Sequence, residues 1–464
     1  MKRLLVYSAL SVPTMAIVTI GVIVSERAIG SKANNVGHRS DRMGTTYGLN
    51  HFEPAILQKE LLQSTAPVSR IELHEAIRRS GNYLVQSVGS DGQFVYRRYV
   101  TGHAMNTRYN MLRHAGSLYA LAQFYHWRPD EGTWAALIRG RDFMRREMRP
   151  LSGQPDKLAL WSRASISGRD IPLTAKLGGS GLALVALASM YEIDQSATTI
   201  VEMRRLANFI CFMQKPDGGF YSKFIPSLGG RLDTFVSVYY PGEAALGLLM
   251  LYRIDPQPVW LDSALQALTF LADQRKGQSM VPADHWALIA TAELMSLNVT
   301  GTSAVLANDL PSSSTLQVEW DHALQVYRSI LVTRPRLRHG TPGYGGFVAD
   351  GRTCPTATRL EGILAMLPWL SHEQFTIRQW SEHTTTEGIR FLLESQIRDG
   401  ELVGGIPRSV RSWQEGDPFF TEAFNRRVGE IRIDYVQHSL SAFIAYDAYW
   451  DDQRRIHVSS HTDF

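Results

Sequence analysis

The chain has 464 residues, of which 44% are hydrophobic and 20% are charged, and its formal net charge is +4. This composition is typical of a globular protein, and the small net charge argues against nucleic acid as a partner. Two cysteines, Cys211 and Cys354, are too few for a disulfide framework or a cysteine zinc site, although a single bridge between them stays open.

An uncharged apolar segment stands near the start of the chain. Residues 4–24 follow Lys2 and Arg3 and contain no charged side chain. Such a segment is long enough to cross a bilayer, and the basic residues before it favour a cytoplasmic N-terminus. We expect a transmembrane signal anchor over residues 1–25, with a cleaved signal peptide as the alternative. Residues 26–66 are polar and are interpreted as a tether, so the rest of this single-pass protein is expected to be periplasmic or extracellular.

Residues 67–455 contain a repeat of roughly sixty residues. In each unit an amphipathic run is followed by a loop and then by a run that is apolar almost all round, which is typical of a buried helix. Four of the first runs end in a glutamine, namely Gln86, Gln214, Gln274 and Gln396. The second runs begin at Arg113, Leu177, Tyr240, Asp284, Arg359 and Asp434. The pattern predicts an all-α domain, an (α/α)6 barrel with six inner helices inside six outer ones.

Polar residues are concentrated where the expected inner helices begin. In such a barrel the inner helices run the same way, so their N-terminal ends collect on one face, where helix dipoles favour anions. Cationic and aromatic side chains there suit an anionic sugar polymer. The candidate substrate-binding residues are Tyr109, Asn110, Arg113, Lys176, Tyr240, Trp286, Arg359, Glu361, Arg432, Asp434 and Tyr435.

The catalytic candidates are Glu243, Asp284, His114, His285 and His438. In a hydrolase, Glu243 and Asp284 would form the acid and base pair. In an epimerase or lyase, a histidine or tyrosine would remove the proton beside a uronate carboxylate, and Arg113 or Arg359 would neutralise that carboxylate.

Each catalytic candidate also has a structural alternative. Asp284 and Asp434 could be helix caps, and His285 could merely flank such a cap. His114 could be a hydrogen-bonded core residue. His438 could pair with Asp434 four residues earlier, and Glu361 could pair with Arg359.

Familiar cofactor motifs are absent from the sequence. It contains no phosphate loop, no dinucleotide glycine signature, no HExxH and no GxSxG. We therefore expect no cofactor, and no residue is assigned as a metal ligand.

The helix hairpins, and loops such as QKPDGGF from Gln214 to Phe220, resemble the α/α-toroid superfamily. That superfamily includes six-hairpin glycosidases, sugar 2-epimerases, uronyl C5-epimerases, some polysaccharide lyases and squalene-cyclase-type proteins. The resemblance implies a barrel of helix hairpins, but no catalytic motif is matched residue by residue.

We expect a membrane-anchored, extracytoplasmic, carbohydrate-active enzyme that acts on an anionic glycan as a hydrolase, epimerase or lyase. One alternative is a non-catalytic scaffold that binds a glycan or polymer during cell-surface polysaccharide assembly or export. A second alternative is a terpene cyclase-like enzyme.

Overall fold

The computed structural model describes residues 68–101, 108–300, 313–371 and 375–459. The expected anchor and tether, residues 1–66, lie outside these ranges and stay a prediction. Among the helices of the described ranges, none combines the length and the apolar character needed to cross a membrane.

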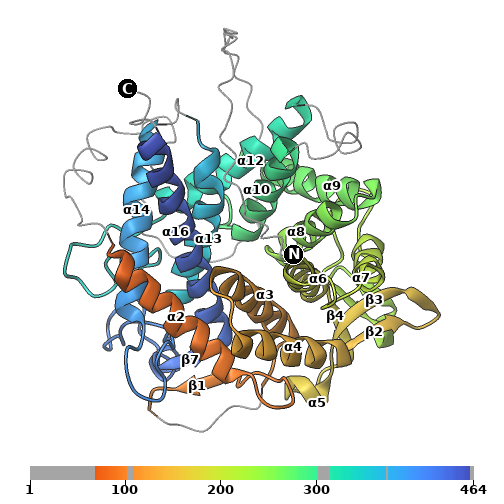
Figure 1. Cartoon of the computed structure of the whole chain (residues 1–464), viewed down its shortest axis with the longest axis horizontal. Helices are drawn as coiled ribbons and strands as arrows, with labels where there is room; N and C mark the ends of the chain where they lie inside the picture. Colours follow the sequence, from red (N-terminus) through yellow and green to blue (C-terminus); the bar gives the residue numbers. More distant parts are fainter. Residues whose placement is uncertain (1–67, 102–107, 301–312, 372–374, 460–464) are drawn as a thin grey trace, which may run out of the picture.

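The described part of the chain alternates outer and inner helices around a common centre (Figure 1). The outer helices are α2 (Arg70–Ser87), α4 (Glu131–Arg146), α7 (Ile200–Phe212), α9 (Pro258–Arg275), α12 (Ser313–Val332) and α14 (Phe375–Ser395). The inner helices are α3 (Met111–Trp127), α6 (Leu177–Ile193), α8 (Tyr240–Ile254), α10 (His285–Thr300), α13 (Thr353–Met366) and α16 (Ile433–Ser459). The predicted six hairpins are confirmed.

The inner helices form a closed ring. Each packs on the next, from α3 through α6, α8, α10 and α13 to α16, and α16 packs back on α3. Glycine allows the closest of these contacts. An ideal Cβ on Gly181 of α6 would lie 2.7 Å from the carbonyl oxygen of Glu243 on α8. Glycine at this position therefore lets the backbones of α6 and α8 approach closely.

Two of the four repeated glutamines, Gln214 and Gln396, join neighbouring outer helices to one another. At the end of α7, Gln214 Nε2 donates to the Ser263 carbonyl of α9 at 2.8 Å, and its Oε1 accepts from the Ser263 hydroxyl at 2.7 Å. At the end of α14, Gln396 Nε2 donates to the Ala76 carbonyl of α2 at 2.9 Å. The last outer helix is thereby joined to the first, whereas Gln86 and Gln274 are exposed at the ends of α2 and α9.

The glycines of the repeat loops occupy positions where only glycine fits. Gly218 has φ +87° and Gly404 has φ +86°, a region that disfavours side chains. An ideal Cβ on Gly218 would lie 2.5 Å from the Gln266 carbonyl oxygen, and one on Gly404 would lie 1.9 Å from the Arg79 carbonyl oxygen. Each loop is thus a tight turn pressed against the next outer helix.

The all-α prediction missed two small antiparallel sheets. The first pairs β1 (Arg97–Tyr99) with β7 (Glu430–Arg432), and the second has the order β2–β3–β4–β5–β6. Its strands are Met148–Leu151, Gln154–Ser162, Thr174–Lys176, Lys223–Ile225 and Gly230–Leu232. Most of these strands span three or four residues, which is too short for an alternating pattern to register. Strand β4 ends where α6 begins and β7 ends where α16 begins, so the sheets fix the starts of inner helices.

Four short helices complete the described ranges: α5 (Ala164–Ser167), α15 (Glu422–Asn425) and the 3-10 turns η1 (Pro226–Leu228) and η2 (Leu367–Trp369). Cys211 and Cys354 are both free thiols, so the bridge that the sequence left open is not formed. Burial raises the pKa of Cys354 to about 12, which keeps this inner-helix thiol protonated.

The tight contact between α6 and α8 predicts an uncommon effect of a glycine-to-alanine change. Although alanine favours a helix by about 1 kcal/mol over glycine, Gly181→Ala should lower the free energy of unfolding by about 1–3 kcal/mol through overpacking. Urea unfolding measures this difference. Gly132→Ala, on an exposed turn of α4, serves as the control and should change stability by less than about 1 kcal/mol. Equal effects of the two substitutions would contradict the close packing.

Candidate active site

The first residues of α3, α6, α8, α10, α13 and α16 form one face of the barrel, which we call the mouth. Neighbouring helices meet start to start: an ideal Cβ on Gly178 of α6 would lie 2.5 Å from Tyr240 of α8. Likewise, one on Gly242 would lie 2.9 Å from the Trp286 Cβ of α10. The inner helices are therefore parallel, and their polar first turns come together as the sequence predicted.

Glu243 is a buried carboxyl with an unused oxygen. It lies in the first turn of α8 and is 3% exposed, and its Oε2 has no hydrogen-bond partner. An ideal Cβ on Gly178 would lie 1.8 Å from that oxygen, so the missing side chain of this glycine makes room for the carboxyl.

The surroundings of Glu243 keep its carboxyl protonated. Burial, helped by the charge of Asp284, raises its pKa to about 8, and the positive charges of Arg113 and Lys176 oppose this shift only in part. A carboxylic acid with this pKa can donate a proton at neutral pH.

Asp434 is the opposite case, because two guanidinium groups bind it. Its Oδ2 accepts from Arg113 Nε at 2.8 Å and from Arg432 Nη2 at 2.8 Å. Burial alone would raise the pKa of Asp434, but the two arginines lower it below its usual range. Arg113 also donates to the Tyr96 hydroxyl at 2.6 Å. The group joins α3 to α16. Arg432 also lies 3.8 Å from Glu430, which Arg97 and Arg427 contact as well, so four arginines face two carboxylates here.

Lys176 stands at the N-cap of α6, and no described residue pairs with its ammonium group. Burial, followed by repulsion from Arg113 and Lys223, lowers its pKa to about 8. Lys176 is thus a cation that an incoming anion would stabilise.

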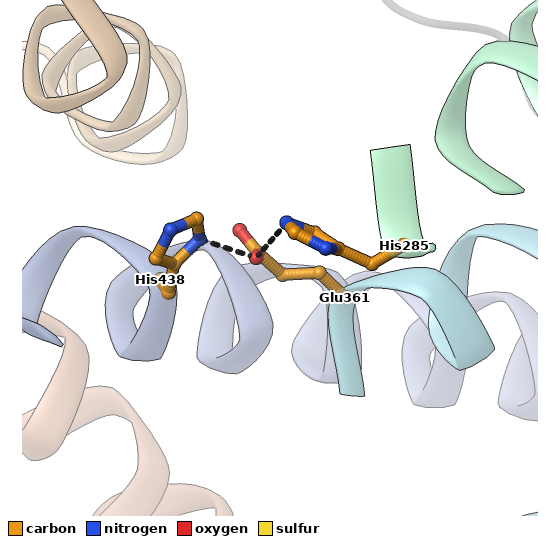
Figure 2. A group of neighbouring side chains, drawn as sticks. All are labelled: His285, Glu361 and His438. Atoms are coloured by element: carbon orange, nitrogen blue, oxygen red, sulfur yellow. Dashed lines mark hydrogen bonds and ion pairs between the residues drawn. The ribbon is translucent and has the colours of Figure 1, made fainter. Parts of the chain in front are cut away.

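A second group of ionisable side chains comes from three different inner helices (Figure 2). His438 Nδ1 lies 2.7 Å from Glu361 Oε2, and His285 Nε2 lies 4.0 Å from the same oxygen. The two imidazoles flank the carboxylate from opposite sides, with ring centroids 5.4 Å apart (Figure 2). Glu361 therefore pairs with His438, and neither the predicted alternative pair with Arg359 nor that of His438 with Asp434 is formed.

His285 has no hydrogen-bond partner on either ring nitrogen, although it is only 2% exposed. Burial, together with the charges of His438 and Arg359, lowers its pKa well below the usual range, so the ring is neutral. Burial also raises the pKa of Glu361, against the effect of His438. The group can accept protons or hold a cation, because it offers two imidazoles and one carboxyl.

Asp284 uses both carboxyl oxygens in structural contacts. One accepts from the Ala287 backbone N–H at 3.2 Å and caps α10, and the other accepts from Arg275 Nη2 at 2.7 Å. Both partners of this ion pair are buried. The arrangement favours the capping alternative, and an acid–base pair of Asp284 with Glu243 stays a prediction.

His114 and Tyr109 lie in the core rather than at the mouth. His114 Nδ1 accepts from the Tyr109 hydroxyl at 2.7 Å, and its Nε2–H donates to the Gly140 carbonyl of α4 at 2.8 Å. Burial lowers the pKa of His114 to about 4. This geometry matches the structural alternative for His114, whose nitrogens are both satisfied.

The remaining polar and aromatic candidates either form structural hydrogen bonds or are buried. Asn110 caps α3 by accepting from the Leu112 N–H at 3.1 Å. Tyr435 is buried and donates to Glu430 at 2.8 Å, and Trp286 is buried beside His285 and His438. Four of the candidate substrate-binding residues are aromatic, namely Tyr109, Tyr240, Trp286 and Tyr435. Of these, Tyr240 alone keeps part of its surface exposed, and the other three are buried.

Sequence reasoning missed Tyr96 and Cys354 near the mouth. Tyr96 lies before β1 and contacts Arg113, and Cys354 lies within electrostatic range of Asp434. Tyr96 lies outside the inner helices, so their pattern does not indicate it. Cys354 lies in the first turn of α13, which begins at Thr353, whereas the sequence analysis started that run at Arg359.

The structural reading of Asp284 predicts the effect of removing its charge. Asp284→Asn should lower the free energy of unfolding by about 3–5 kcal/mol, because Arg275 is left as a buried unpaired cation. Thermal or urea unfolding measures the loss. Asp130→Asn, at the exposed N-cap of α4, is the control and should cost less than about 1 kcal/mol. A neutral effect of Asp284→Asn would contradict the structural reading.

No family model and no curated protein matches the sequence. The structure is similar to cellobiose 2-epimerase from Spirochaeta thermophila, with TM-score 0.56 and 14% identity over 86% of this chain and 100% of that one. It is also similar to a D-mannose isomerase (TM-score 0.55, 12% identity, 83% of this chain and 100% of that one). An unsaturated glucuronyl hydrolase specific for heparin has TM-score 0.54 and 10% identity, over 82% of this chain and 99% of that one. At these identities the similarity concerns the fold, and the predicted α/α toroid is confirmed.

Proposed function

We propose that the protein is a carbohydrate-active enzyme that transfers protons to and from a sugar bound at the mouth. The proposal is supported by the three similar structures, whose names describe a sugar epimerase, a sugar isomerase and a glycoside hydrolase. It is also supported by the side chains that the ring brings together, which are ionic rather than purely aromatic. A terpene cyclase-like enzyme would need an apolar, aromatic-lined site.

Glu243 carries the proposal. A buried carboxyl with a free oxygen and a pKa of about 8 has the form of a general acid at neutral pH. The group around Glu361 contains His285, the first residue of α10, and supplies a second reactive centre. Glu243 as an acid and the group around Glu361 as a second proton-transfer group lie on different helices. Such a pair suits hydrolysis, epimerisation and elimination alike, because all three reactions need proton transfer.

We propose an anionic glycan as the substrate because positive charge is in excess. Four arginines (Arg97, Arg113, Arg427 and Arg432) face two carboxylates, Asp434 and Glu430. The ammonium group of Lys176 forms no ion pair within the described ranges. A uronate carboxylate next to Lys176 would supply the missing partner, since charge-assisted hydrogen bonds to carboxylates are the strong ones.

The cellular setting remains the one that the sequence predicts. We propose that residues 4–24 anchor the protein in a membrane and that the barrel lies outside the cytoplasm. The uncharged segment behind Lys2 and Arg3 supports this topology.

Incubating the full-length protein with uronate-containing and neutral oligosaccharides in D2O would separate the reaction types. An epimerase incorporates deuterium at carbon, a lyase creates a conjugated double bond, and a hydrolase releases reducing ends. Binding of a glycan without any of these products would favour the scaffold alternative.

Removal of the acid should stop turnover without harming the fold. Glu243→Gln should lower turnover by about 100- to 10,000-fold, the usual contribution of a general acid. The matched control is Glu319→Gln on the outer helix α12, since Glu319 is also buried with one unpartnered oxygen. The Glu319 variant should keep full activity. Full activity of the Glu243 variant would remove this residue from the mechanism.

The raised pKa of Glu243 also predicts how stability depends on pH. The unfolded chain loses this proton near pH 4.5, whereas the folded chain keeps it up to about pH 8. The contribution of Glu243 to folding therefore becomes less favourable as pH rises between these values, by up to about 1.4 kcal/mol per pH unit. Glu243→Gln lacks this penalty. Urea unfolding should show the variant gaining stability over the wild type from pH 5 to pH 8, and a pH-independent difference would contradict the assignment.

A further inference from the structure

We propose that His285, Glu361 and His438 bind a divalent transition-metal ion, for which Zn²⁺ is the expected occupant. Two imidazoles and one carboxylate form a ligand set that suits zinc and other first-row divalent metals. The chain has no metal-binding sequence motif, because the three ligands come from three separate inner helices, α10, α13 and α16.

The distances between the ligand atoms fit a shared metal ion. The three atoms lie within 4.8 Å of one another. Metal–ligand bonds of about 2.0–2.2 Å in a tetrahedral site place ligand atoms roughly 3.3–3.5 Å apart. The separations of 2.7 Å from His438 to Glu361 and 4.0 Å from His285 to Glu361 stand on either side of this value. Each separation differs from this value by less than about 1 Å.

The unpartnered ring of His285 is the independent observation that points to a ligand. Its two nitrogens are buried and lack any hydrogen-bond partner, which ordinarily costs about 1–3 kcal/mol per group. Its Nε2 is the atom nearest to Glu361, and Figure 2 shows the ring directed at that carboxylate. A metal bond from Nε2 would satisfy this nitrogen, whereas a simple hydrogen-bonded relay leaves it 4.0 Å away from the carboxylate.

Neighbouring residues hold the three ligands in place. Gly362 follows Glu361, and an ideal Cβ on it would lie 3.1 Å from the His285 Cβ, so the glycine lets α10 and α13 approach closely. Trp286 lies 5.0 Å from the His285 ring and 6.2 Å from the His438 ring, measured between centroids. The Ser441 hydroxyl donates to Gln123 Oε1 at 2.6 Å and lies close enough to the Glu361 carboxyl to lower its pKa. Such outer contacts orient the ligands of metal sites.

Three protein ligands leave a coordination position for water or a substrate oxygen, as in catalytic zinc sites. Metal binding itself does not depend on the proposed glycan activity. Only the use of the ion in catalysis rests on that proposal, in which the ion would polarise a sugar oxygen or a bound water.

The test uses full-length protein that has been freed of metal with a chelator and then titrated with ZnCl2 and, separately, with CoCl2. Calorimetry should show one tight site per chain, and Co²⁺ should give the visible absorption bands of a four- or five-coordinate ion. His285→Gln and Glu361→Gln should each weaken this binding by more than about 100-fold, beyond the loss caused by an outer-shell change.

The matched control is His383→Gln on α14, which removes a histidine that contacts a single carboxylate, Glu387, at 3.3 Å. This variant should bind Zn²⁺ as the wild type does. Circular dichroism checks the fold of each variant, and the wild-type Co²⁺ spectrum decides the question even where a variant fails to fold. Absence of those bands, or equal binding by the His285 and His383 variants, would overturn the metal site.

The two proposals fail separately. Glycan turnover that depends on Glu243 but continues in chelator-treated protein without bound metal would overturn the metal site alone. A metal-loaded wild type that binds Zn²⁺ through His285 but converts no oligosaccharide would overturn the proposed function alone.

Discussion

Closure of the inner ring is the constraint on which the rest of the structure depends. The Arg113–Asp434 ion pair joins the first and last inner helices, although the residues are 321 positions apart in the sequence. The Gln396 side chain makes the corresponding link between the last and first outer helices. Because the ring closes with all inner helices parallel, six polar first turns that are distant in the sequence must meet at one mouth.

The mouth gives chemically similar groups different protonation states. Glu243 and Asp434 are both buried carboxyls, but Asp434 has two arginine partners while Glu243 faces the glycine gap at Gly178 with one oxygen unpaired. One carboxyl is therefore held as an anion and the other as an acid. Separation of pKa values between neighbouring carboxyls by their surroundings is a recurring basis of proton-transfer chemistry. The imidazole of His285 is neutral, so one of its ring nitrogens can donate an electron pair without first losing a proton.

The hairpins could be predicted from sequence because the inner helices are apolar almost all round and the glutamines recur at a fixed phase. The sheets could not, since their strands are too short for a pattern. Helix phase indicated which residues stand near the starts of the inner helices, but it did not fix where their side chains point. Arg113 and His114 are adjacent, but successive helical residues differ by about 100° in direction. Arg113 therefore reaches Asp434 in the ring, while His114 faces α4 and the core.

The same limit applies to the other polar residues. Asp284 precedes His285, yet it turns toward Arg275 of the outer helix, and His285 turns toward Glu361. The contact of His438 with Glu361 spans 77 residues, which no local pattern reveals. The position of a residue in the repeat thus indicates that it stands near the start of an inner helix. The contacts between helices decide which of these residues come together in one site.

A double-mutant cycle on Arg113 and Asp434 tests ring closure most directly. The free energy of unfolding would be measured for the wild type, Arg113→Met, Asp434→Asn and the double variant. The account predicts a coupling energy of about 1–3 kcal/mol between the two sites, as for residues in direct contact. Additivity within about 0.5 kcal/mol would mean that the first and last inner helices do not meet. The single mouth on which both proposals rest would then be lost.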